Sequence, residues 1–120
     1  MKNKDAIILE KILSYCRQMK EACDLFGNDY GTFVENSVFK NACCMCILQI
    51  GELCKLISCE LRNQEKAVPW RAWCGIRDVF AHQYDNLDYQ SAWDTIQNDL
   101  PLLKAEIERI QNKESQEAGG

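Results

Sequence analysis

Apolar residues recur at helical spacing in two long segments of this chain. The first lies between Asp5 and about Leu25, and the second runs from Val38 to about Cys59. In both, the apolar positions are three or four residues apart, which places them on one face of an α-helix. These positions are Ile8, Ile12, Tyr15, Met19, Ala22 and Phe26 in the first segment, and Phe39, Ala42, Cys43, Cys46, Ile50, Leu53, Cys54 and Ile57 in the second. We predict a long N-terminal helix and a central helix that pack through these faces.

Turn and cap residues divide the region between and after these helices. Residues 27–31 have the composition of a turn, and Thr32 with Glu35 resembles a capping box that opens a short helical turn. Residues 61–68 are polar and basic and are predicted to form a loop. Pro69 suits the first turn of a further helix, whose core-facing positions are Trp73, Ile76 and Phe80. Trp70 is predicted to be a packing residue, with base stacking as the alternative.

The C-terminal third predicts one more helix with an interruption. Asp88 is a good N-cap for a helix that carries Trp93 and Ile96. Pro101 lacks a backbone donor, so a kink or restart is expected at residues 98–100, before the apolar pattern resumes. After Gln111 the residues are polar and small, and we predict a frayed, flexible tail over 113–120.

These elements define the fold class. No period-two strand pattern and no internal repeat are found, so we predict an all-α antiparallel bundle of four to five helices. A chain of 120 residues with 47% apolar composition suits one domain, assigned to residues 1–112.

Composition narrows the class of partner and the compartment. The net charge is −4, which argues against a general nucleic-acid coat protein. The apolar run from Ala6 to Leu9 is too short for a signal peptide, and no stretch is judged long and apolar enough to span a membrane. We therefore expect a cytoplasmic protein. Its eight cysteines are interpreted as small core residues in a reducing compartment, and the single CxxC of Cys43 and Cys46 is not expected to bind zinc.

Candidate chemistry is concentrated between Ile76 and Asp85. This stretch contains Arg77, Asp78, Tyr84 and His82, the only histidine of the chain. Arginine can bind a phosphate with two hydrogen bonds, and histidine titrates near neutral pH, so these residues fit a phosphoryl-transfer site. The alternative from this stretch alone is an ordinary ion pair beside a surface histidine.

Helical spacing adds a condition on this site. Asp78 and His82 are four residues apart and share a face, so the carboxylate can orient the imidazole. Arg77 and His82 lie about 140° apart on a continuous helix. They converge on one phosphate only if the helix breaks near Ala81 or if a second protomer supplies one of them. One histidine cannot easily serve as acid and base in the same step, so we predict a homodimer.

A basic patch precedes the histidine. Residues 61–77 contain four basic side chains and one acidic side chain, whereas residues 85–120 contain three basic and eight acidic side chains. Arg62, Lys66 and Arg71 are therefore candidates for holding RNA, although solvated helix faces would give the same pattern.

Four short segments, taken together, resemble one family. They are Gln49-Ile50-Gly51-Glu52-Leu53-Cys54-Lys55, Val68-Pro69-Trp70-Arg71, Gly75-Ile76-Arg77-Asp78-Val79-Phe80-Ala81-His82-Gln83-Tyr84 and Asp99-Leu100-Pro101-Leu102-Leu103-Lys104. In order and spacing they are similar to the HepT-like branch of the HEPN superfamily, the ribonuclease toxins encoded beside minimal nucleotidyltransferase antitoxins.

The resemblance implies a function and roles for the motif residues. A helical homodimer would cleave RNA without a metal or other cofactor, at an Arg-x4-His-x-Tyr motif in the intersubunit cleft. Arg77 and His82 occupy the catalytic positions, Asp78 and Tyr84 support them, and Tyr84 is the position to which the antitoxin attaches AMP. The alternative function is a non-catalytic helical dimer that binds nucleotide or RNA as the partner module of a nucleotidyltransferase.

Overall fold

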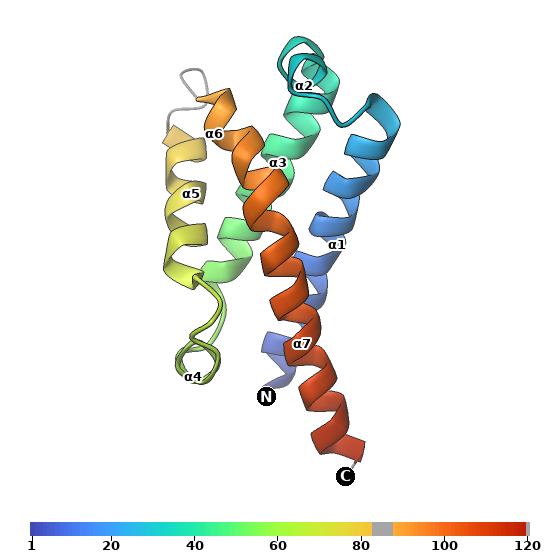
Figure 1. Cartoon of the computed structure of the whole chain (residues 1–120). Helices are drawn as coiled ribbons and strands as arrows, with labels where there is room; N and C mark the ends of the chain where they lie inside the picture. Colours follow the sequence, from blue (N-terminus) through green and yellow to red (C-terminus); the bar gives the residue numbers. More distant parts are fainter. Residues whose placement is uncertain (83–87, 120) are drawn as a thin grey trace.

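The described part of the protein is a bundle of helices (Figure 1). The computed structural model describes the backbone of residues 1–82 and 88–119, with side chains except those of residues 77, 80–82 and 117–119. No β-strand occurs within these ranges, so the all-α prediction is confirmed. The three six-residue helices α2 (Tyr30–Glu35), α4 (Cys59–Gln64) and α6 (Tyr89–Asp94) supplement the longer ones.

Helix α3 (Ser37–Lys55) lies at the centre, as the apolar pattern predicts, but it ends at Lys55 rather than near Cys59, where α4 begins. It packs against α1 (Asn3–Phe26) and against α5 (Trp70–His82), while α7 (Leu100–Gly119) packs against α1 (Figure 1). The predicted core faces are largely buried, but Ala42 is exposed. Additional core residues come from positions outside the predicted stripes, namely Leu9, Leu13, Cys16, Cys23, Cys44 and Ile47.

Caps explain where several helices begin. Asn36 accepts hydrogen bonds from the backbone N–H groups of Val38 and Phe39, and Asp88 caps α6 as predicted. The cap of α2 was predicted at the wrong residue. The N-cap is Asp29 rather than Thr32. The Asp29 carboxylate accepts hydrogen bonds from both the backbone N–H and the hydroxyl of Thr32.

The predicted loop at residues 61–68 is wrong in its first half, because α4 continues to Gln64. Ser58 caps α4 by accepting a hydrogen bond from Leu61 N–H. Asp5 of α1 is buried and accepts from the Ser58 N–H at 3.0 Å and from its hydroxyl at 2.5 Å. A residue 53 positions away thus secures the start of α4, and a local pattern does not contain that information.

The predicted interruption before Pro101 is confirmed. Residues 95–99 form a π-helix, η2 (Thr95–Asp99), directly before α7. Proline cannot donate to the preceding turn, which accounts for the change of winding at this point.

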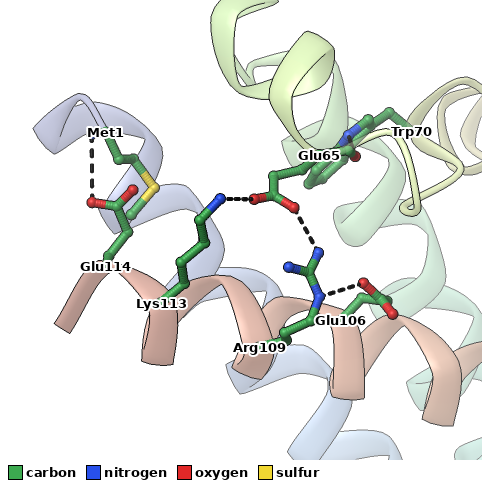
Figure 2. Close-up of polar contacts among 7 residues, drawn as sticks. All are labelled: Met1, Glu65, Trp70, Glu106, Arg109, Lys113 and Glu114. Atoms are coloured by element: carbon green, nitrogen blue, oxygen red, sulfur yellow. Dashed lines mark hydrogen bonds and ion pairs between the residues drawn. The ribbon is translucent and has the colours of Figure 1, made fainter. Parts of the chain in front are cut away.

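The tail predicted after Gln111 is wrong in secondary structure, because α7 continues to Gly119. Long-range ion pairs hold this part of the helix (Figure 2). Glu65 is buried and contacts Arg109 at 2.6 Å and Lys113 at 3.5 Å, and Glu114 lies 3.5 Å from the amino group of Met1. The assignment of residues 1–112 as the domain remains a prediction.

One of the described helices, α3, is long and apolar enough to cross a membrane by length and composition alone. This differs from the expectation that no such stretch exists. Its residues Cys43, Ile47, Ile50 and Cys54 are buried in the core, so the same composition is accounted for by its central position.

Candidate active site

Helix α5 positions the candidate motif. Trp70 and Trp73 in its first turn are buried, and Trp73 N–H bonds to the Pro69 carbonyl. The indole N–H of Trp70 donates to the backbone oxygen of Glu65 at 3.0 Å (Figure 2). Trp70 is therefore a packing residue, and its alternative role in base stacking is not supported. These two anchors fix the helix on which residues 77–82 follow.

The helix runs without interruption through Ala81 to His82. Arg77 and His82 therefore lie on one continuous helix, about 140° apart around its axis. A break near Ala81, one of the two conditions for their convergence, is absent from this helix. The side chains of Arg77 and His82, and the whole of Tyr84, lie outside the described residues, so their catalytic and modification roles remain predictions.

Asp78 has an ionic partner that the sequence did not indicate. Its Oδ1 lies 2.6 Å from Nζ of Lys55, at the C-terminal end of α3. Asp78 keeps its position four residues before His82, on the same helical face. Lys55 stands in one of the family-like segments, but its contact with a helix 23 residues away could not be read from spacing.

The three predicted RNA-binding side chains do not form one equivalent patch. Lys66 and Arg71 are exposed. Arg62 is half-buried and donates a 2.7 Å hydrogen bond to the backbone oxygen of Cys54, near the end of α3. Its Nε is buried without a hydrogen-bond partner. The geometry therefore assigns Arg62 to packing of α4 against α3, and leaves Lys66 and Arg71 as accessible cations.

Six of the eight thiols are core groups, as interpreted from the sequence, but Cys59 and Cys74 are not buried. All eight cysteines are free, and six are buried, whereas Cys59 is exposed and Cys74 is intermediate. Burial raises the pKa of the Cys16 thiol to about 12 and that of Cys44 to about 11. Within the described residues, no group of three or more His, Cys, Asp or Glu side chains is arranged to hold a metal ion.

An apolar cavity of about 300 Å³ borders the motif helix. It lies between α5 and the η2–α7 segment, and its lining includes Trp73, Ile76 and Leu103. A second cavity, of about 460 Å³, lies between α1 and α7 and is lined by Cys16 and Cys23 among others. The lining of the first cavity extends along α5 to Ile76, the residue before Arg77.

Comparison with known proteins decides the family. The family model described as "Ribonuclease HepT-like" matches residues 12–110, which include most of the chain and the whole motif helix. The chain belongs to the HepT-like ribonuclease family. As a HepT-like protein of the HEPN superfamily, it is assigned to the ribonucleases, as the resemblance of its four segments predicts.

Several relatives of this HepT-like protein are named as ribonucleases. It is 35% identical over 82 residues to "Putative RNase MJ0125" of Methanocaldococcus jannaschii, which covers 68% of this chain and 71% of the relative. It is 32% identical over 106 residues to "Putative RNase TTE0752" of Caldanaerobacter subterraneus subsp. tengcongensis, covering 88% and 93%. It is 33% identical over 61 residues to "Probable ribonuclease HepT" of Thermococcus cleftensis, covering 51% and 56%. No solved structure matches significantly.

Proposed function

We propose that this protein is the toxin of a toxin–antitoxin system, a metal-independent endoribonuclease that acts as a homodimer. Membership of the HepT-like family supports the ribonuclease activity. The continuity of α5 through His82 carries the proposal of a two-chain site. Because Arg77 and His82 occupy positions about 140° apart around the axis of α5, two protomers with facing α5 helices can present both residues to one phosphate.

Exposed apolar side chains support such an interface. Met45 on α3 is 53% exposed and Val79 on α5 is 48% exposed, although these two helices pack against each other. Val79 directly follows Asp78 on α5, so an exposed apolar side chain adjoins the motif at this point. A second copy of the chain would bury them and bring two motifs together.

The reaction follows from the groups that such a dimer would bring together. A ribose 2′-hydroxyl attacks the adjacent phosphorus while the bond from phosphorus to the 5′ oxygen breaks, which leaves a 2′,3′-cyclic phosphate and a 5′-hydroxyl. One His82 accepts the proton of the attacking hydroxyl and the other donates a proton to the leaving oxygen. Arg77 stabilises the charge that develops on the phosphate oxygens, and Asp78 favours the charged imidazole.

Regulation is proposed to act through Tyr84. A cognate nucleotidyltransferase antitoxin would attach AMP to its hydroxyl, which adds a negative phosphate and a bulky nucleoside close to Arg77 and His82. The added group would exclude RNA by charge and by volume. The free, mostly buried thiols support action in the reducing cytoplasm.

The decisive experiment is cleavage of total RNA by the purified protein in the presence of a chelator. We expect fragments with cyclic phosphate and 5′-hydroxyl ends, which His82→Ala abolishes at unchanged helical content. Gln18→Ala, an exposed substitution on α1, serves as the control and should cleave normally. Strict dependence on Mg²⁺ would contradict the metal-free mechanism. RNA retention without cleavage would favour the alternative, a non-catalytic dimer that binds nucleotide or RNA.

A further inference from the structure

Lys55 joins the central helix to the motif helix. Its ammonium nitrogen lies 2.6 Å from Oδ1 of Asp78, a short distance even for a charge-assisted hydrogen bond. The contact is tertiary, since the residues are 23 positions apart and belong to α3 and α5. It ties the last residue of α3 to the turn of α5 that contains Arg77.

The exposure of the Lys55–Asp78 pair argues against a main role in folding stability. The Lys55 side chain is 36% exposed and that of Asp78 is 53% exposed. Water and salt screen a pair this open, and such pairs add little to folding stability. The contribution of this ion pair to folding stability is therefore expected to be small.

The position of Asp78 makes its charge important for the proposed reaction. It follows Arg77 directly and stands one helical turn before His82. A carboxylate there favours the charged imidazole, but it also repels the phosphates of an approaching RNA. A cation that pairs with Asp78 keeps the carboxylate in one place and offsets this repulsion.

We propose that Lys55 is a positioning residue of the ribonuclease site, which fixes the Asp78 carboxylate and offsets its repulsion of the RNA backbone. The inference rests on the proposed ribonuclease function. It assigns Lys55 no contact with the reacting atoms, because its effect passes through Asp78.

The kinetic test uses four variants and measures KM and kcat on RNA at low and moderate salt. Lys55→Met should raise KM about two- to fivefold at low salt, the range expected for an exposed charge interaction. Lys55→Arg should stay near the wild type, and Asp78→Asn added to Lys55→Met should bring KM back. Lys20→Met removes an exposed pair with Asp24, at 3.5 Å on α1, and should leave both constants unchanged.

A second measurement does not depend on cleavage. The chain has one histidine, so its imidazole gives a single set of NMR resonances. Lys55→Met removes one positive charge beside Asp78 and should move the midpoint of the His82 titration to higher pH, and Asp78→Asn in the same chain should reverse that shift. Lys20→Met should not move it. If the Lys55–Asp78 pair has no electrostatic link to His82, the midpoint should not move in any variant.

The outcomes separate the inference from the function on which it rests. If the wild type cleaves RNA and Lys55→Met behaves as Lys20→Met in both measurements, the role of Lys55 is overturned alone. If Asp78→Asn fails to restore KM, Lys55 contacts RNA directly and the positioning role is wrong. If the wild type does not cleave RNA, the proposed function fails, and an unchanged histidine titration in Lys55→Met then rejects the link between Lys55 and the motif separately.

Discussion

Replacing Arg109 is expected to destabilise the fold more than replacing most residues of similar exposure. The Glu65 side chain is 7% exposed, and Arg109 approaches its carboxylate at 2.6 Å (Figure 2). Removing one partner of a buried ion pair costs about 3–5 kcal/mol, because the other charge is left buried. Here Lys113 remains 3.5 Å away and Arg109 is 45% exposed, so we expect a smaller cost of about 1.5–3 kcal/mol for Arg109→Met.

The free energy converts into a melting temperature through the size of the chain. At roughly 2.1 cal/mol/K per residue, unfolding 120 residues has an entropy of about 0.25 kcal/mol/K. Arg109→Met should therefore lower Tm by about 6–12 °C, measured by circular dichroism at fixed protein concentration. Arg17→Met removes an exposed pair with Glu10 at 3.2 Å and should shift Tm by less than about 3 °C.

The same cluster predicts a pH dependence. The hydrogen bond from Arg109 holds the pKa of Glu65 below its ordinary value of 4.5. The folded state therefore favours the ionised carboxylate, and this stabilisation is present above pH 4.5 and disappears as the pH falls through the lowered pKa. The Tm difference between wild type and Arg109→Met should shrink on acidification. Equal effects of Arg109→Met and Arg17→Met at neutral pH would refute this reasoning, as would a difference that grows in acid.

Three further predictions concern the motif and the start of the bundle. Mixing inactive Arg77→Ala and His82→Ala proteins should restore part of the RNA cleavage if the two residues act across the interface, whereas proven subunit exchange without recovery would place them in the same chain's site. Tyr84→Phe should retain some cleavage but gain no AMP from a cognate nucleotidyltransferase and ATP, and mass spectrometry showing AMP only on another tyrosine would contradict the assignment. Asp5→Ala removes the acceptor for both Ser58 donors and should cost about 1–3 kcal/mol in urea unfolding, with an unchanged midpoint as the opposing result.

The sequence predicts those parts of the fold that depend on local periodicity and on proline. The stripes of α1 and α3, the Asp88 cap and the interruption before Pro101 are of this kind. Helix α4 and the end of α7 were missed for a common reason. Ser58 is a local cap signal for α4, but both segments are also stabilised by buried carboxylates from distant parts of the chain, Asp5 for α4 and Glu65 for α7.

In the candidate site too, the local features could be predicted from the sequence and the tertiary contacts could not. The spacing of Arg77 and His82 on a helix is a local property, and the structure places both on α5. The pairing of Lys55 with Asp78 and the bond from Arg62 to Cys54 depend on how helices pack, so neither follows from sequence order. Composition made Arg62, Lys66 and Arg71 look alike, although only the last two remain open to a ligand.

Because its core is rich in cysteine, this protein is expected to lose its native state irreversibly in proportion to how often it unfolds. In the folded state six thiols are shielded, and their raised pKa values leave almost no thiolate to react. Each complete opening releases all of them at once. Without a reductant, any wrong disulfide that forms in the open state would trap the chain, and denaturation would become irreversible. The lifetime of the native protein outside a reducing compartment is thus governed by the unfolding rate. Alkylation followed by mass spectrometry can measure this rate, because a molecule that unfolds changes from one or two modified cysteines to eight.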